Sequence, residues 1–179
     1  EKCTAVPEWE GCHLWTNLLT GCEADTEKRE KWVHLFSCNP DGSDPPDAVV
    51  RPVEGLEGLN FHDPSVKTQV MPIVNVLKKI GYGTANLAAA TYDWRQAPKI
   101  LEQRDQFFTR MQATVESLYE QNSKKAVVFV AHSMGCKIVH YFLHWIKWNP
   151  LGYEWVQEHI HSFFAISGPF LGSPQTLIS

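Results

Sequence analysis

One stretch of this chain, residues 126–140, most constrains what the chain can fold into. An apolar, β-branched run over Val127–Val130 leads into the turn Ala131–Gly135, and an amphipathic segment follows the turn. A strand, a sharp turn and a helix in this order are typical of a nucleophile elbow, whose turn lifts a Ser hydroxyl above the edge of a sheet. Ser133 stands at the centre of this turn. The alternative interpretation is that Ser133 only caps a helix that follows a core strand.

Small residues on both sides of Ser133 favour the elbow. The strand and the helix nearly touch at such a turn, which requires small side chains there. Gly135 meets this requirement, and Ala131 stands where the usual pattern has its first Gly. His132 is interpreted as a residue that shapes the turn, because it is too close in the chain to serve Ser133 well as a base. In an elbow, the backbone N–H of Met134 is one of the two donors of an oxyanion hole.

The partners that a catalytic Ser needs are missing from the sequence. A His must take the proton of the Ser, and an acid must orient that His. In α/β-hydrolases both residues follow the Ser in the chain. No Asp follows Ser133, and the neighbours Glu158 and His159 are poor candidates because they lie just before the next predicted strand. The chain also begins with Glu1 rather than Met, so we expect it to be truncated at both ends.

Strands and helices alternate along the chain, which predicts an α/β fold with a mostly parallel sheet flanked by helices. Apolar spacing and β-branched runs predict helices at about 26–36, 66–80, 100–121, 136–148 and 151–159, and strands at 48–53, 84–91, 126–131 and 161–167. Gly81 supplies a stop for the helix 66–80. The predicted inner face of the helix 100–121 consists of Phe107, Phe108, Met111, Val115, Leu118 and Tyr119.

Composition and charge exclude several classes of function. A chain of 179 residues suits one domain with a sizeable core, and its net charge of −4 leaves no basic footprint for nucleic acid. No apolar run approaches the roughly 18 residues that span a bilayer. His140 and His144 lie four residues apart on one predicted helix, a spacing that can indicate a metal. Without a third ligand we interpret them as solvent-facing or core-edge side chains, and we expect neither metal nor cofactor.

The cysteines are distributed unevenly. Four of the five lie in the first 38 residues, at Cys3, Cys12, Cys22 and Cys38. Their spacings match no zinc pattern, in which pairs lie two to four residues apart. One or two disulfides in an oxidising compartment are favoured over free thiols, although the sequence does not determine the pairing. Cys136, at the start of the helix after the elbow, is interpreted as a small core side chain.

Two further segments follow predicted strands, where sites of α/β proteins gather. In Ala90–Pro98, Asp93 and Arg95 form a predicted structural ion pair that holds the loop, and Trp94 caps the core beside it. In Ser167–Ser173, Gly168 and Gly172 permit a close approach to the site, and Phe170 and Leu171 are candidates to line an acyl pocket. The preference of ordinary turns for glycine explains these two residues equally well.

Three segments together resemble the lecithin:cholesterol acyltransferase family, which includes phospholipid:diacylglycerol and phospholipid:sterol acyltransferases. Tyr92–Arg95 is similar to the family's Tyr-Asp-Trp-Arg loop, and Ala131–Gly135 followed by Tyr141–Leu143 is similar to its nucleophile helix. Ser167–Ser173 is similar to its Gly-x-Pro-x-x-Gly segment. The resemblance covers about residues 48–173 and is specific because three separate motifs agree.

This resemblance implies an α/β-hydrolase fold. Residues 48–179 would be the N-terminal part of the core with the elbow, and residues 1–47 a Cys-rich cap or lid with a disulfide such as Cys12–Cys38. Ser133 would take a fatty acyl group from a phospholipid and pass it to diacylglycerol or a sterol, with Trp94 and His132 close to the substrate. Membrane contact and a location in the endoplasmic reticulum or secretory lumen follow from the same resemblance. The chain by itself is expected to be inactive.

Two other functions stay open at this point. A phospholipase or lipase would form the same acyl-enzyme and use water as the acceptor, and the sequence does not show how well the site excludes water. A non-catalytic lipid-binding module would need no triad, in agreement with the missing Asp and His.

Overall fold

The structure, a computed structural model, describes residues 2–3, 30, 33–34, 36–46, 48–59 and 70–173. The chain divides into two compact units, one of residues 1–75 with 88–107 and the other of residues 76–87 with 108–179. The predicted boundary after residue 47 stays a prediction, because most of residues 1–47 lie outside the described part.

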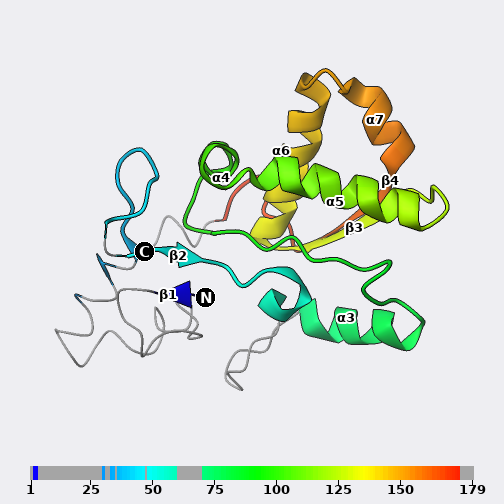
Figure 1. The fold of residues 1–179 in the computed structure, drawn as a ribbon, viewed down its shortest axis with the longest axis horizontal. Helices are drawn as coiled ribbons and strands as arrows, with labels where there is room; N and C mark the ends of the chain where they lie inside the picture. The colour runs from blue at the N-terminus through cyan, green and yellow to red at the C-terminus, as the bar shows by residue number, and fades with distance from the viewer. Residues whose placement is uncertain are drawn as a thin grey trace. The chain divides into compact units, whose positions relative to one another are not determined.

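The second unit contains a parallel pair of strands, β3 (Val127–His132) and β4 (Ile160–Ile166), in which Val130 lies beside Phe164. The chain passes from β3 to β4 through two helices, α6 (Met134–Trp148) and α7 (Gly152–His159), seen side by side in Figure 1. Parallel strands require such a crossover. The predicted strand–helix–helix–strand order is therefore confirmed, and the protein is an α/β protein with a small parallel sheet.

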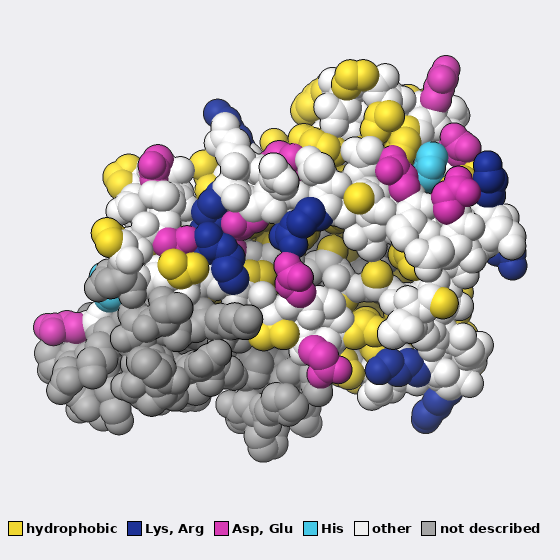
Figure 2. Space-filling view, viewed as in Figure 1, with side chains coloured by type: hydrophobic (Ala, Val, Ile, Leu, Met, Phe, Trp, Pro, Cys, Tyr) yellow, Lys and Arg dark blue, Asp and Glu magenta, His cyan; other side chains and the backbone are white. Residues whose placement is uncertain are grey.

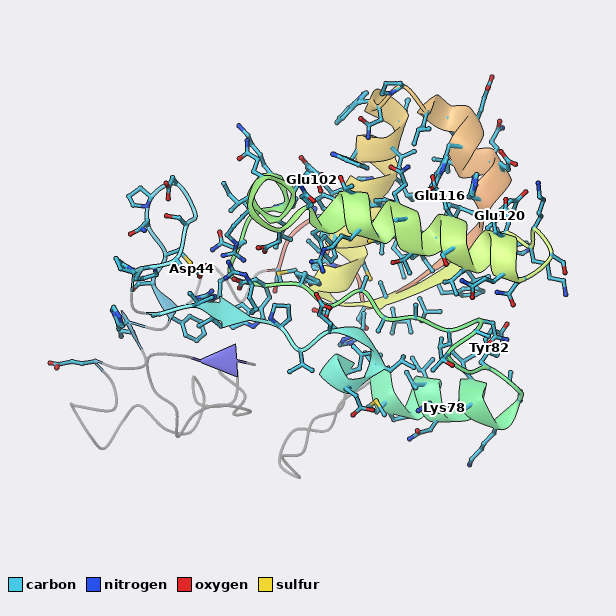
Figure 3. All side chains as sticks on the ribbon, in the orientation of Figure 1. Asp44, Lys78, Tyr82, Glu102, Glu116 and Glu120 are labelled. Carbon is cyan, nitrogen blue, oxygen red and sulfur yellow. The ribbon has the colours of Figure 1, made fainter. Side chains whose placement is uncertain are left out.

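Aromatic side chains form the core of this unit. Phe142 of α6 is fully buried, as is Phe108 of α5 (Phe107–Gln121). The Phe142 ring lies 6.3 Å from Phe108, 5.8 Å from Phe129 of β3 and 6.0 Å from Trp155 of α7. Glu116 lies between α5 and α7 in Figure 3, and its Oε1 accepts a hydrogen bond of 2.9 Å from Trp155 Nε1. Three helices and one face of the strand pair therefore meet around Phe142.

The opposite face of β3 and β4 is open among the described residues. Val128, Val130 and Phe164 are between 44% and 58% exposed. An unbroken apolar run such as residues 127–131 is typical of strands buried on both faces. The prediction that this strand is buried is therefore not confirmed, because the other residues of β3 are only half-buried.

The predicted helix 100–121 is two helices, so that prediction is wrong in its extent. The helix α4 (Pro98–Asp105) ends at Gln106, which adopts a left-handed conformation with φ 50° and ψ 38°. The Gln106 N–H donates to Glu102 O at 2.9 Å and closes the last turn of α4. The chain then re-enters helix at Phe107. The predicted inner face of α5 is confirmed, because Phe107, Phe108, Met111, Val115 and Tyr119 are all buried and Leu118 is half-buried.

The predicted strand 84–91 is also wrong. Residues 84–86 form a turn, in which Asn86 Oδ1 accepts the Gly83 N–H at 2.7 Å, and residues 87–93 have no regular structure. A strand exists only where a neighbour completes its hydrogen bonds. No strand of the described parts pairs with residues 87–91. Thr91 Oγ1 donates instead to Val53 O at 2.8 Å.

The strands in the described residues of the first unit are short. The strand β2 (Val50–Arg51) pairs antiparallel with β1 (Lys2–Cys3) and ends before Pro52, so the predicted strand 48–53 is present over two residues only. A short 3-10 helix, η2, covers Gly55–Leu59.

The helix α3 (Val70–Lys79) confirms the predicted helix, and Gly81 follows it with φ 100°. The described residues 30, 33, 34 and 36 are helical as well, as predicted for residues 26–36.

Candidate active site

The turn between β3 and α6 holds Ser133 in a strained backbone conformation. Its φ of 52° and ψ of −124° lie in a region that residues other than Gly rarely adopt. A sharp turn between a strand and a helix requires such a conformation, because the chain reverses within one residue. Ser133 is exposed at the end of the strand. The geometry is that of the predicted elbow.

Neighbouring groups hold the strained turn in place. The Ser133 N–H donates to Ile166 O, at the end of β4, over 2.9 Å. The Cys136 N–H donates to Ser133 O over 3.0 Å, which starts the first turn of α6. Cys136 is fully buried, and its Sγ donates to Ala131 O at 3.2 Å. Cys136 is therefore the predicted core side chain, and it fastens the helix to the strand.

The capping interpretation of Ser133 is wrong. Ser133 occupies the position before α6, but its side chain makes no capping hydrogen bond. The hydroxyl is therefore not engaged with the helix that follows. Met134 is the first residue of α6, so its N–H has no acceptor within the helix. A helix N-terminus also favours negative charge.

The glycines near the turn have different roles. A Cβ at Gly168 would lie 2.8 Å from Cys136 Cβ and 2.8 Å from Phe170 Cε2, so the predicted close approach occurs there. For a Cβ added at Gly172, no atom of the described residues lies within 4 Å, and the requirement there is a φ of 97°. The close approach predicted at Gly172 therefore stays a prediction. A Cβ at Gly135 would meet Ala131 Cβ at 3.6 Å, an ordinary contact.

We expect Gly168→Ala to lower the free energy of unfolding by about 1–3 kcal/mol, because the added methyl overlaps two side chains. Gly135→Ala adds the same methyl to α6 without overlap, and we expect a change of less than about 1 kcal/mol. Urea unfolding of both variants measures the difference. Equal destabilisation by the two substitutions would contradict the close packing at Gly168.

The loop after β4 lies against α6. Lys137 Nζ donates to Phe170 O at 3.2 Å, and the Phe170 ring meets the His140 ring edge-on at 5.9 Å. Phe170 is 42% exposed and Leu171 is fully exposed. These two residues, predicted to line an acyl pocket, are therefore not core side chains. His132 ends β3 and is half-buried.

In the first unit, Asp93 and Arg95 form the predicted ion pair. Arg95 Nε donates to Asp93 Oδ1 at 2.8 Å, and a terminal guanidinium nitrogen lies 2.7 Å from Oδ2. This bidentate geometry is the strongest form of a carboxylate–guanidinium contact. The Asp93 carboxylate is buried, and Arg104 donates to its Oδ2 at 2.9 Å. Trp94 packs its ring 5.0 Å from Phe36, and its predicted contact with substrate stays a prediction.

Sequence reasoning missed the larger ion network around this pair. Arg104 also binds Asp105 at 2.6 Å, and Arg51 binds Asp44 at 2.7 Å and Asp105 at 3.3 Å. Asp44, labelled in Figure 3, has a buried Oδ1 without a hydrogen-bond partner in the described parts of the chain. Sequence spacing does not signal this network, because it joins residues as far apart as Arg51 and Asp105, which are 54 positions apart. Acidic and basic side chains also lie next to one another over the face shown in Figure 2.

The ion pairs lower the pKa of Asp93. Burial raises this pKa, but the hydrogen bonds and charge of Arg95 and the hydrogen bond of Arg104 lower it further, to below the ordinary 3.8. A depressed folded-state pKa means that the stabilisation is complete above the unfolded pKa and is lost as the pH falls toward the folded one. We therefore expect the free energy of unfolding to fall as the pH drops below the ordinary pKa of 3.8. Asp93→Asn should flatten that dependence in urea titrations, and an unchanged slope would contradict this origin.

The predicted disulfide Cys12–Cys38 is wrong for this structure. Cys38 carries a free thiol, and its Sγ accepts a hydrogen bond from Gln96 Nε2 at 2.8 Å. The loop residue Gln96, rather than a second cysteine, is thus the partner of Cys38. Cys12 and the predicted cap lie outside the described residues.

The residues after Ser133 do not supply a triad within the described parts of the chain. Glu158 Oε1 accepts a hydrogen bond from Tyr119 at 3.2 Å, and His159 stacks on Trp155 at 4.6 Å. The side chains of Glu158 and His159 therefore both contact residues of the helices α5 and α7. No group of three or more His, Cys, Asp or Glu side chains in the searched, described residues could hold a metal ion. Among the described residues, no helix combines the length and apolar composition that a membrane crossing requires.

The fold and the turn at Ser133 define the protein as an α/β protein with a strained Ser between a parallel strand and a helix. The family model for lecithin:cholesterol acyltransferase matches residues 12–179. The chain belongs to this family.

Curated relatives agree with this membership. Phospholipid:diacylglycerol acyltransferase 1 of Arabidopsis thaliana is 38% identical over 94% of this chain and 27% of its own length. Phospholipid–sterol O-acyltransferase of the same plant is 34% identical over 83% of this chain and 25% of its own. The lysosomal phospholipase A and acyltransferase of Bos taurus is 32% identical over 66% of this chain and 28% of its own length. The chain therefore spans about a quarter of the length of these relatives. No solved structure matches it.

Proposed function

We propose that this chain carries the nucleophile of a lipid O-acyltransferase with an α/β-hydrolase fold, and that Ser133 is this nucleophile. The observation that carries the proposal is the backbone of Ser133, with φ 52° and ψ −124°, between a parallel strand and a helix. Strained backbone conformations cluster at active sites. The exposed, uncapped hydroxyl is free to meet an ester.

The reaction proceeds in two acyl transfers. Ser133 Oγ attacks the ester carbonyl of a phospholipid and gives its proton to a general base. The C–O bond to the glycerol breaks, and the lysophospholipid leaves with a proton while the acyl group stays on Oγ. A hydroxyl of diacylglycerol or a sterol then attacks the acyl-enzyme, loses its proton to the same base, and releases Ser133.

The start of α6 suits the negative charge that develops on the carbonyl oxygen. The Met134 N–H has no acceptor in the helix and is the proposed first donor of the oxyanion hole. His132, Phe170 and Leu171 are the proposed substrate contacts of this unit. Exposed apolar side chains such as Leu171 suit acyl chains at a membrane surface.

The acceptor distinguishes a transferase from a hydrolase. One relative is named for diacylglycerol and another for a sterol. A third is named both a phospholipase A and an acyltransferase. We propose transfer as the main reaction and hydrolysis as the alternative. The test supplies the full-length protein with phospholipid vesicles labelled in the acyl chain, with and without diacylglycerol or sterol.

We expect label in triacylglycerol or sterol ester when the acceptor is present. Label only in free fatty acid would favour the hydrolase. Label remaining in phospholipid under all conditions would favour the non-catalytic lipid-binding module. A Ser133→Ala variant in each arm separates this reaction from contaminating activities.

A further inference from the structure

Two histidines on the outer side of α6 turn their ring edges toward each other. His140 Nε2 and His144 Nε2 are 3.3 Å apart, whereas the ring centroids are 4.7 Å apart. The nitrogens are thus nearer to each other than the rings are. The rings cross at 79°, so they do not stack. The two Nε2 atoms therefore face each other beside the helix.

This separation is compatible with a shared metal ion as well as with a hydrogen bond between the two rings. Two imidazole nitrogens at about 2.0–2.1 Å from a tetrahedral Zn²⁺ are about 3.3–3.4 Å apart, and a right-angled geometry would bring them to about 2.9 Å. The observed 3.3 Å matches the tetrahedral value.

The helix holds the pair ready for such an ion. Residues four apart are neighbours on one helix face, and this spacing supplies two zinc ligands in known metal-binding helices. Aromatic rings fix the two imidazoles from either side, with Phe170 5.9 Å from His140 and Trp148 5.4 Å from His144. His140 is exposed, so an ion can reach the pair from solvent.

We propose that His140 and His144 bind one Zn²⁺ through their Nε2 atoms. Because the searched residues hold no group of three such donors, water or small anions complete the tetrahedron. His140 lies seven residues after Ser133, about 10 Å along the helix axis. The site is therefore separate from the proposed nucleophile, and it does not depend on the proposed function.

The test is a Zn²⁺ titration of the full chain by competition with a chromogenic chelator. We expect one Zn²⁺ per chain for the unmodified protein and for Ser133→Ala. We expect His140→Gln and His144→Gln each to weaken binding at least tenfold. His161→Gln removes an exposed histidine of β4 outside the pair, and we expect it to bind like the unmodified protein. Circular dichroism controls for folding in each variant.

X-ray absorption at the zinc edge supplies a second readout, with two imidazole nitrogens at about 2.0–2.1 Å expected. Absence of binding to the unmodified protein would overturn the proposal. Equal binding by the unmodified protein and both pair variants would overturn it as well. Equal loss in His161→Gln would show that the ion does not sit at the pair.

Discussion

Ser133→Ala should abolish covalent labelling of the full-length protein by a fluorophosphonate and reduce acyl transfer by about a million-fold. The reason is that only an activated hydroxyl attacks the probe or the ester, and the substitution removes its oxygen. The fold should remain intact, because the Ser133 side chain makes no capping hydrogen bond that Ala would lose. Labelling is read on a gel after incubation with lipid vesicles, and transfer is read from labelled phospholipid.

Ser167→Ala is the matched control for this variant. Ser167 follows the neighbouring strand β4 and has the same φ of 52° as Ser133, so the substitution carries a similar backbone cost. We expect Ser167→Ala to label like the unmodified protein. Labelling that persists in Ser133→Ala, or that disappears equally in both variants, would contradict Ser133 as the nucleophile.

Asp93→Ala should lower the free energy of unfolding at pH 7 by about 3–5 kcal/mol. The substitution removes a buried carboxylate and leaves the Arg95 guanidinium, which is only 4% exposed, without its closest anion. Arg104 loses a contact of 2.9 Å at the same time. An uncompensated buried charge is among the most destabilising changes in a protein. Urea unfolding followed by circular dichroism measures the loss.

Asp41→Ala tests whether burial causes this effect. Asp41 Oδ1 also accepts two hydrogen bonds, from the Ser43 N–H at 2.9 Å and from Ser43 Oγ at 2.7 Å, but the side chain is exposed. We expect a loss of about 1 kcal/mol or less, because water replaces these bonds. A loss at Asp93 as small as the loss at Asp41 would show that the network contributes little to stability.

The two variants address different properties of the chain. The Ser133 variant tests chemistry while the fold is kept, and the Asp93 variant tests the fold without touching the nucleophile. A protein that unfolds readily in Asp93→Ala and labels normally in its folded fraction would show that the Tyr92–Arg95 loop is structural. This is the role that the bidentate pair of Asp93 with Arg95 supports.

The sequence by itself determined the strand, the turn and the helix around Ser133. An apolar, β-branched run and helical spacing are local properties, and the constraints of a tight turn act within a few residues. The Asp93–Arg95 pair was predictable for the same reason, since the two residues are two positions apart. The three motifs, read together, also indicated the family.

Only the tertiary structure decided the break at Gln106, the absence of a strand at 84–91 and the contact of Gly168 with Cys136. It also brought Asp44, Arg51 and Arg104 to the Asp93 cluster. Apart from the break at Gln106, these features depend on partners far away in the chain. A strand needs a neighbouring strand, and a buried charge needs a counter-ion. Local patterns do not specify such partners, because the packing of the whole unit selects them.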